Sequence, residues 1–343
     1  MKKSLIIILL ACIILTSCNS KKVELSGAGA TFPLPYYNMV FNNYSEATGI
    51  NVSYGGIGSG GGVRSLKDKI IDFAGTDVYL TDEEMSSMPP VIHVPTCLGA
   101  VVLSYNIPGV KELKLTSDII ADIYLGNITK WNDPRIVAIN PEENLPDMLV
   151  TPVYRSDGSG TTFVFSDYMN KVNDNWSKAL GSGKSLKFNI GIAAKGNPGV
   201  VGTIANMKGS IGYIGSEYAF AMNIPVAKIQ NAKGQFVSPS SKSITASLSG
   251  DIPDDLRCTI TNADTDGAYP ISCLTWILVY KEQNYANRSL EKAQATADLL
   301  RFVLNTDSQQ LTEKIHYAPL PSYIIEKALA AISSMTYNNQ PIN

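Results

Sequence analysis

From residue 23 onward, short apolar segments alternate with glycine-rich turns and with amphipathic segments. Apolar residues that recur three and four positions apart predict helices, and short apolar runs bounded by turns predict strands. The alternation of the two is typical of an α/β protein with parallel strands. We expect strands at 23–26, 50–54, 73–74, 92–105 with breaks, 149–154, 210–214 and 274–280, and the clearest helices at 33–48, 162–170 and 290–304.

Length and composition indicate two globular domains. The chain has 343 residues, of which 45% are hydrophobic and 17% charged, and single cores usually stop growing below this size. Lys and Arg number 28 against 30 Asp and Glu, so the formal net charge is -2. Because no excess of positive charge is available for a nucleic-acid backbone, we expect no nucleic-acid partner. A small anion remains possible, since backbone donors can bind it with few formal charges.

The first residues follow the pattern of an export signal. Lys2 and Lys3 precede an apolar run over 5–15 that is too short to span a bilayer as a helix. The sequence LTSC at 15–18 resembles the bacterial lipobox, in which the signal is cut before the Cys and the Cys is acylated. We therefore expect an exported protein anchored to a membrane through lipidated Cys18, with 1–17 as the signal peptide and 18–22 as the tether. Cys12 is a weaker second candidate, and an ordinary cleavable signal with an incidental Cys is the alternative.

Three further cysteines lie in the body of the chain. Cys97 stands in an apolar stretch and is expected to be a small buried residue. Outside the cytoplasm a disulfide between Cys258 and Cys273 is conceivable. The spacing of these residues does not indicate a metal site, and neither a metal nor a cofactor is expected.

Glycine-rich segments stand between a predicted strand and a predicted helix at 27–32, 55–62 and 157–162. A helix N-terminus presents unpaired N–H groups and a partial positive charge, and glycines let a ligand approach the backbone. Three such segments that converge would form an anion site. The side chains available to it are the hydroxyls of Thr31, Ser59, Ser159 and Thr161 and the guanidinium of Arg155, which can pair bidentately with an oxyanion. The alternative is that these residues are ordinary helix caps and turns.

Two other phosphate motifs fit less well. The residues at 56–61 match G-x-G-x-x-G, with Asp77 near the distance of a ribose contact, but the following segment 63–69 predicts only a short helix with little apolar surface. The residues at 181–185 resemble the end of a phosphate-binding loop, but Lys178 occupies the position of its first glycine, and we interpret this stretch as a flexible surface loop.

Hydrolytic catalysis is weakly indicated. Ser59 and Ser159 lack the glycine that a nucleophile elbow has two positions earlier. His93 and His316 lie far from both serines in the sequence, so structural histidines are favoured over a Ser–His pair, which remains open.

Seven stretches together resemble the periplasmic phosphate-binding proteins of bacterial phosphate ABC transporters. They are GAGATFPLPYY (27–37), YGGIGSGGGV (54–63), DFAGTD (72–77), DIYLGNITKWNDP (122–134), RSDGSGTTFVFSDYM (155–169), GSIGYIGSEYA (209–219) and YAPLP (317–321). The resemblance implies the type II periplasmic-binding-protein fold, with two α/β lobes, two crossover hinge segments and a ligand cleft between the lobes. It also implies a monomeric, non-enzymatic protein that passes inorganic phosphate to the permease subunits of an ABC transporter. We expect lobe I at 23–97 plus 273–343 and lobe II at 98–272.

The resemblance also assigns roles to individual positions. It places Thr31, the backbone of Phe32, Ser59, Asp77, Arg155, Ser159, Gly160 and Thr161 around phosphate, with Asp157 holding Arg155. Gly60 departs from the family pattern, which often has Ser there; its backbone donor could remain, but a hydroxyl contact would be lost.

Asp77 is the residue expected to decide selectivity. A carboxylate beside an anion is useful only as the acceptor of a proton that the anion retains, and phosphate retains one at neutral pH whereas sulfate does not. The alternative for Asp77 is a cap or surface turn before 81–84. Two other functions stay open: binding of sulfate or molybdate, and an exported phosphatase.

Overall fold

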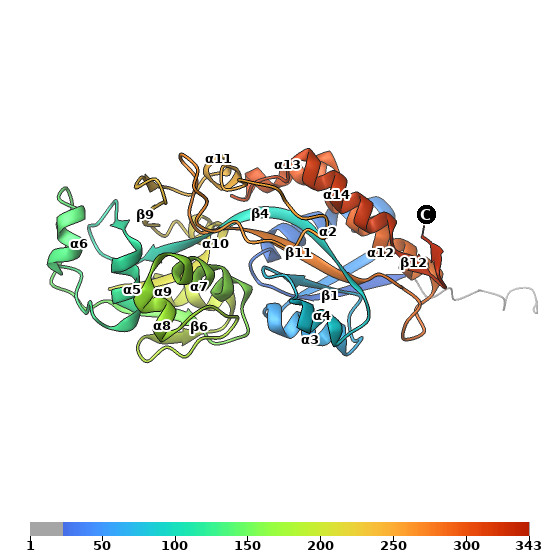
Figure 1. Cartoon of the computed structure of the whole chain (residues 1–343), viewed down its shortest axis with the longest axis horizontal. Coiled ribbons are helices and arrows are strands. Elements are labelled where there is room, and N and C mark those ends of the chain that lie inside the picture. Colours follow the sequence, from blue (N-terminus) through green and yellow to red (C-terminus); the bar gives the residue numbers. More distant parts are fainter. Residues whose placement is uncertain (1–22, 343) are drawn as a thin grey trace, which may run out of the picture.

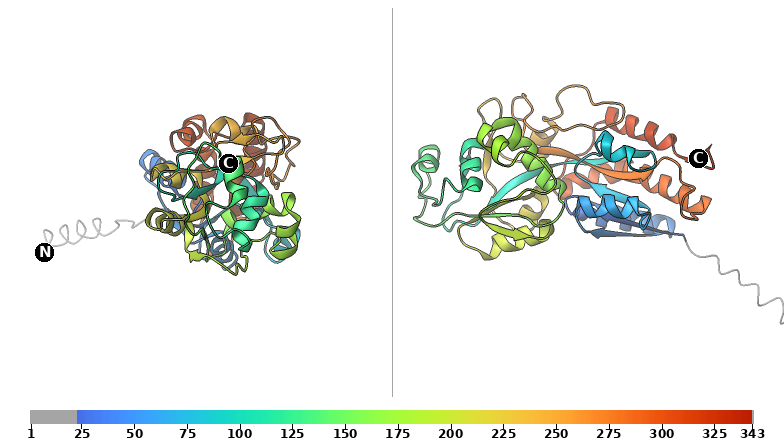
Figure 2. Two further views of the ribbon diagram at one scale, coloured as in Figure 1. Left: turned by 90° about the vertical axis from the view of Figure 1, so that its left-hand side faces the viewer. Right: turned by 60° about the horizontal axis from the view of Figure 1, so that its bottom comes forward.

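The computed structural model describes residues 23–342. The predicted signal peptide, Cys12 and Cys18 lie outside the described residues. The molecule is elongated, with one group of elements at each end of its longest axis and two long strands running between them (Figures 1 and 2).

An eight-stranded mixed sheet forms the centre, in the order β2-β1-β3-β11-β4-β8-β6-β7. Its strands are β1 (Glu24–Gly29), β2 (Asn51–Gly56), β3 (Phe73–Thr76), β4 (Val91–Tyr105), β6 (Thr151–Arg155), β7 (Ile192–Ala194), β8 (Ser210–Gly215) and β11 (Ser272–Tyr280). Short strands complete the fold: β5 (Lys114–Leu115), β9 (Lys228–Gln230) and β10 (Phe236–Val237) form one small sheet, and β12 (Thr336–Tyr337) and β13 (Gln340–Pro341) form another.

Strand β4 belongs to two sections of the sheet. Its residues 91–100 pair with β11, and its residues 101–105 pair with β8. We call β2, β1, β3, β11 and 91–100 the first section, and 101–105, β8, β6 and β7 the second section. The strands β4 and β11 therefore carry the chain between the two ends of the molecule (Figure 1).

Helices pack on both sections. They are α2 (Leu34–Thr48), α3 (Ser59–Lys67), α4 (Asp82–Ser86), α5 (Ser117–Leu125), α6 (Pro134–Ile139), α7 (Gly160–Val172), α8 (Asp174–Ala179), α9 (Gly196–Asn206), α10 (Ser216–Ala221), α11 (Ser241–Thr245), α12 (Leu290–Val303), α13 (Thr306–Lys314) and α14 (Ser322–Ser333). Helices α2 and α3 cover the first section, and α7 and α9 cover the second. The C-terminal helices α12, α13 and α14 lie with the N-terminal elements at the same end of the molecule (Figure 1).

The burial of the sheet explains its sequence pattern. All nine residues of β11 are buried, and fourteen of the fifteen residues of β4 are buried, because both strands are central and covered on both faces. The prediction of an α/β protein with parallel strands is confirmed by the parallel pairs of β1 with β2 and β3 and of β6 with β7 and β8, but the sheet as a whole is mixed. Strand β11 runs antiparallel to β3 and β4, and β4 runs antiparallel to β8. A strand buried on both faces reads as a continuous apolar run in either direction, so the pattern does not carry the direction.

Candidate functional site

The carboxyl ends of parallel strands bring the predicted site residues together. Strands β1, β2 and β3 are parallel neighbours, so the loops that carry Thr31, Ser59 and Asp77 leave the same edge of the first section. In the second section, β6 ends at Arg155 and the chain enters α7 at Gly160.

Direct hydrogen bonds join these two sets of loops. The Gly60 N–H donates to the Gly158 carbonyl at 2.9 Å, and the Gly160 N–H donates to the Ser59 hydroxyl oxygen at 3.1 Å. The side chains of Thr31, Ser59, Asp77, Arg155, Ser159 and Thr161 are all buried, as are Phe32 and Gly160. The predicted residues therefore form one buried cluster between the two sections. The backbone N–H of Gly60, the donor that the family pattern would direct to the ligand, bonds to the Gly158 carbonyl instead.

Ser159 caps a helix, but its hydroxyl proton remains available for a further hydrogen bond. Ser159 is the N-cap of α7, and its hydroxyl oxygen accepts the Thr162 N–H at 3.0 Å. A hydroxyl that accepts still has its own proton to donate. The capping alternative and a binding role are therefore compatible at this position.

The other three hydroxyls are also occupied as acceptors. Thr31 accepts both the backbone N–H and the side-chain amide of Asn197, each at 3.0 Å. Thr161 accepts from Arg155 and from Asn197, each at 3.2 Å. Ser59 accepts from Gly160, so each of the four hydroxyl oxygens accepts at least one hydrogen bond from the protein. Within residues 23–342 none of the four hydroxyls donates its proton to a protein acceptor.

Arg155 is held in a fixed orientation by Asp157. Its Nε and Nη2 donate to the two carboxylate oxygens of Asp157 at 2.8 and 2.6 Å, and its Nη1 donates to Thr161. Burial acts to raise the pKa of Asp157, but the hydrogen bonds and charge of Arg155 outweigh it and hold that pKa below its usual value. The pair stays ionised, with a planar guanidinium fixed beside the hydroxyls.

Asp77 is a buried acid rather than a cap. The side chain of Thr81 caps α4, and Asp77 is 3% exposed with its carboxylate bonded to the Thr275 hydroxyl at 2.8 Å. The alternative of a cap or surface turn is therefore wrong. Burial raises the pKa of Asp77 to about 7, although the bond from Thr275 and the charge of Arg155 act in the opposite direction.

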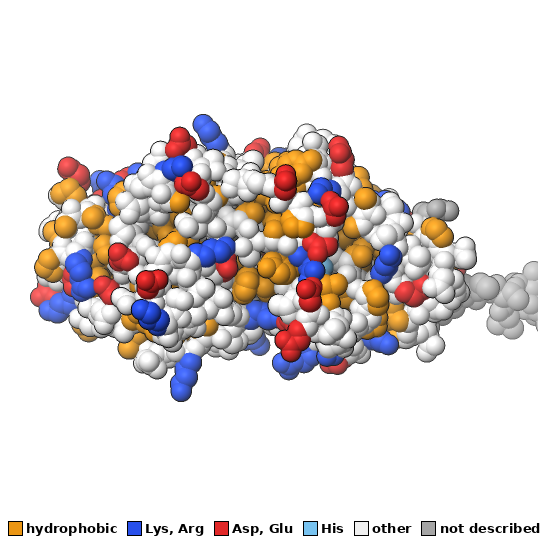
Figure 3. Space-filling model, viewed as in Figure 1, with side chains coloured by type: hydrophobic (Ala, Val, Ile, Leu, Met, Phe, Trp, Pro, Cys, Tyr) orange, Lys and Arg blue, Asp and Glu red, His pale blue; other side chains and the backbone are white. Residues whose placement is uncertain are grey.

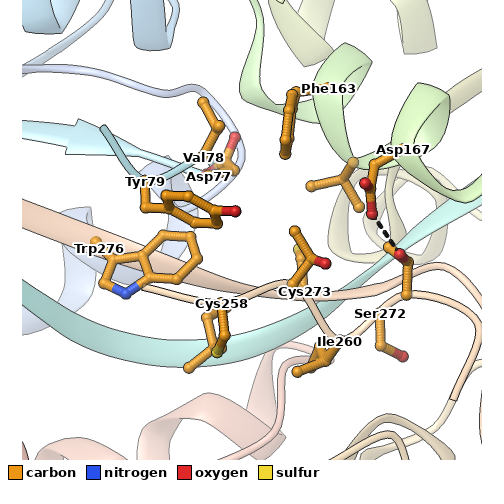
Figure 4. A pocket seen from close by; sticks show the side chains of 14 residues that line it. Asp77, Val78, Tyr79, Phe163, Asp167, Cys258, Ile260, Ser272, Cys273 and Trp276 are labelled. Atoms are coloured by element: carbon orange, nitrogen blue, oxygen red, sulfur yellow. Dashed lines mark hydrogen bonds between the residues drawn. The ribbon is translucent and has the colours of Figure 1, made fainter. Parts of the chain in front are cut away.

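A small cavity lies behind Asp77, away from the glycine loops. Asp77, Tyr79, Phe163, Cys273 and other residues line it, and its volume of about 10 Å³ has room for about one water molecule (Figure 4). Its lining is mainly apolar, and the dashed line in Figure 4 marks the bond between Asp167 and Thr261.

Several residues at the site were not predicted. Asn197, at the start of α9, bonds to Thr31 and Thr161 and so joins the two sections, and Gly196 donates its N–H to Asp157 at 3.0 Å. Residues 192–199 form a fourth strand–glycine–helix junction, and this pattern could have identified them. Thr275 lies in the middle of β11, where no sequence signal distinguishes it.

The competing chemistries find little support in the geometry. Nε2 of His93 accepts the Leu80 N–H at 3.0 Å, and burial lowers the pKa of this imidazole to about 4. The ring of His316 packs against Phe220. Both histidines therefore have structural contacts, and neither bonds to Ser59 or Ser159 among the described residues.

The three body cysteines are free thiols. Cys97 is fully buried, as expected, and Cys258 and Cys273 are not bonded to one another. Between residues 23 and 342 no group of three or more His, Cys, Asp or Glu side chains is placed to hold a metal ion. No helix in that same range is both long and apolar enough to cross a membrane. On the face seen in Figure 3, basic and acidic side chains are interspersed.

A model of the PBP superfamily domain matches residues 16–307. Phosphate-binding protein PstS of Xylella fastidiosa is 37% identical over 313 residues, which cover 90% of this chain and 84% of the relative. Phosphate-binding protein PstS of Pasteurella multocida is 36% identical, with 89% of each chain covered. The chain belongs to the PstS family.

Solved structures support the fold of this PstS-family chain. A high affinity periplasmic phosphate-binding protein bound with phosphate has a TM-score of 0.72 at 21% identity, covering 90% of this chain and 93% of that one. A putative phosphate ABC transporter substrate-binding protein from Clostridium perfringens has a TM-score of 0.64 at 18% identity, covering 87% of this chain and all of the other. The PBP type II fold that the sequence predicted is confirmed.

Proposed function

We propose that this protein binds inorganic phosphate between two lobes and delivers it to an ABC-type permease. The observation that carries the proposal is the state of the four buried hydroxyls: Thr31, Ser59, Ser159 and Thr161 each accept from the protein and keep a proton to donate. Several converging donors beside a fixed guanidinium fit a small oxyanion with many acceptor sites. The names of the PstS relatives support phosphate as that anion.

Each predicted residue has a role in this proposal. Arg155 supplies the positive charge with Asp157 as its support, the hydroxyls donate, and backbone N–H groups from Phe32 and Thr161 add further donors. The Gly160 N–H donates to the Ser59 hydroxyl oxygen and so orients that hydroxyl beside the anion. Hydrogen bonds to a charged partner contribute roughly 1.5 to 3 kcal/mol each. Their sum exceeds any plausible affinity, so phosphate desolvation and closure of the lobes must offset much of it.

Asp77 gives the proposal its selectivity. Its carboxylate would accept the proton that phosphate retains, and sulfate would meet an acceptor without a proton. Because the pKa of Asp77 is raised to about 7, this discrimination works fully only above neutral pH. Sulfate and molybdate remain the alternative ligands, and Asp77 argues against both.

We propose no catalytic activity. The Ser59 and Ser159 hydroxyls accept backbone N–H groups and have no histidine partner among the described residues, so neither is activated as a nucleophile. Turnover of a phosphate ester by the purified protein would contradict this part of the proposal.

The two sections of the sheet support a division of the chain into two lobes. We propose lobe I at 23–97 plus 273–343 and lobe II at 98–272, with the crossing segments in β4 and β11 as hinges. Phosphate that touches both lobes favours the closed arrangement, which offers a permease a signal that the protein is loaded.

Lipidation and location belong to the same proposal. We propose a monomer exported from the cytoplasm and anchored to a membrane by acylated Cys18. Metabolic labelling with a radioactive fatty acid should mark the wild-type protein and not C18A, which should be released into the soluble fraction.

Calorimetry on the phosphate-stripped residues 23–343 tests the binding proposal. Phosphate should bind tightly with one site per chain at neutral pH, and an excess of sulfate should not displace it. Absence of phosphate binding, or a preference for sulfate, would refute it.

A further inference from the structure

Two tyrosines hold the backbone on either side of Phe32. The Tyr218 hydroxyl, from α10, donates to the Thr31 carbonyl, and the Tyr317 hydroxyl, from the segment between α13 and α14, donates to the Phe32 carbonyl. Phe32 itself is fully buried. The two bonds fix the residue whose N–H the proposed function uses as a donor.

The bond from Tyr218 acts directly on that donor. The Thr31 carbonyl and the Phe32 N–H belong to the same planar peptide group, so fixing one fixes the direction of the other. A hydrogen bond to the carbonyl also polarises the group and strengthens its N–H as a donor. Tyr218 lies in the proposed lobe II and Thr31 in the proposed lobe I, so this bond joins the two lobes.

Glu217, which lies beside these tyrosines, is a buried acid whose protonation state needs a physical explanation. It is 3% exposed, and neither of its carboxylate oxygens accepts a hydrogen bond of normal geometry within residues 23–342, although the Tyr317 hydroxyl lies close to it. The titratable groups that face it are Asp77, Tyr218, Tyr317, Cys97 and Cys273, and none of them is a cation. Burial raises the pKa of Glu217 well above its usual value, and the nearby Asp77 raises it further.

We propose that Tyr218 and Tyr317 are positioning residues for the Phe32 N–H, and that Glu217 is a neutral acid whose proton is donated to the Tyr317 oxygen. Tyr317 has one proton, which it gives to Phe32, so its oxygen is free to accept. A charged Glu217 would instead place an unpaired anion beside the cluster that is to receive phosphate. The role of the tyrosines rests on the proposed function, whereas the neutral state of Glu217 does not.

The neutral state is tested by stability of phosphate-free protein against pH. A raised pKa means that the folded protein holds a proton that the unfolded chain releases, so wild type loses stability as pH rises above the usual glutamate value. Glu217→Gln lacks this proton. The folding equilibrium constant of Glu217→Gln relative to that of wild type should rise by up to about tenfold per pH unit as pH increases above the usual glutamate pKa. A difference that stays constant across this range would overturn the neutral state.

The positioning role is tested by phosphate calorimetry on wild type, Y218F, Y317F and Y44F. Tyr44 is the matched control, because it is buried and donates to the Ala295 carbonyl away from the site. We expect about tenfold weaker binding for Y218F and Y317F and a change below about twofold for Y44F. Glu217→Gln should bind like wild type at neutral pH, since its amide can still donate to Tyr317. If wild type binds phosphate and Y218F and Y317F bind it equally well, the positioning role is wrong; if wild type does not bind, the proposed function fails instead.

Discussion

A methyl group at position 160 should hold the two lobes apart. The Cβ of Gly160→Ala would lie 2.6 Å from the Ser59 hydroxyl oxygen and 2.7 Å from both Cβ and Oδ2 of Asp77. Ordinary contacts of a Cβ begin near 3.4 Å, so the neighbours must retreat by roughly 0.7 Å. In the proposed division Gly160 lies in lobe II and its two neighbours lie in lobe I, so separation of the lobes is the simplest relief.

The magnitude follows from the hydrogen bonds that this separation would weaken. It stretches the 3.1 Å bond from Gly160 to Ser59 and moves Ser59 and Asp77 away from Arg155. Losing one charge-assisted hydrogen bond costs roughly 1.5 to 3 kcal/mol. The phosphate Kd should therefore rise about 10- to 100-fold.

Calorimetry and thermal unfolding of G160A and G202A provide the assay. Gly202 is the matched control, because it lies in helix α9 with no atom within 4 Å of the added Cβ. G202A should bind phosphate like wild type, and G160A should keep most of its phosphate-free stability because open lobes accommodate the methyl. A G160A protein with wild-type affinity would refute the reasoning that this close approach is needed for closure.

Three other perturbations follow from the site. In wild type, sulfate should compete better with phosphate as pH falls through about 7, because protonated Asp77 can donate a hydrogen bond to it. In D77N, competition by sulfate should not depend on pH in this way. Equal competition by sulfate at all pH values in wild type would contradict the role of Asp77. R155K should weaken phosphate binding by about 100-fold in calorimetry, since an ammonium group cannot reproduce the paired bonds to Asp157 and the bond to Thr161; a loss below about threefold would contradict the clamp. E84Q should speed phosphate release in stopped-flow measurements by about threefold at most. The ion pair of Glu84 with Lys184 joins the two lobes, but its partial exposure keeps its contribution small. An unchanged release rate at low salt would show that the pair does not stabilise the closed state.

Much of the fold could be predicted from local patterns, but strand direction could not. Helix α2 begins at Leu34 rather than at residue 33, and α7 begins at Gly160 rather than at 162, which are ordinary boundary errors. Residues 92–105 all lie in one strand, β4, but its pairing with β11 shifts register between Pro95 and Cys97, so the predicted breaks appear only as a local irregularity there. Helices α5, α9, α13 and α14 were not among the clearest predictions.

Some residues of the site could be predicted from the sequence and others could not. Glycine loops identified Thr31, Ser59 and Ser159 because they stand at strand ends, where backbone geometry leaves a local signature. Thr275 and Glu217 carry no such signature, since their importance comes from which groups lie across the fold from them. A buried Thr in a strand and an acid in the first turn of a helix are both common for local reasons.

The position of β11 has a consequence for how the protein is made. Strand β11 lies between β3 and β4 in the sheet, although more than 160 residues separate it from β4 in the chain. Until Ser272–Tyr280 has been synthesised, β3 and β4 have no partner between them, and the segment that leaves the ribosome first cannot complete its own sheet. The first section of the sheet therefore cannot close until most of the chain has been synthesised, which is compatible with the export that we propose.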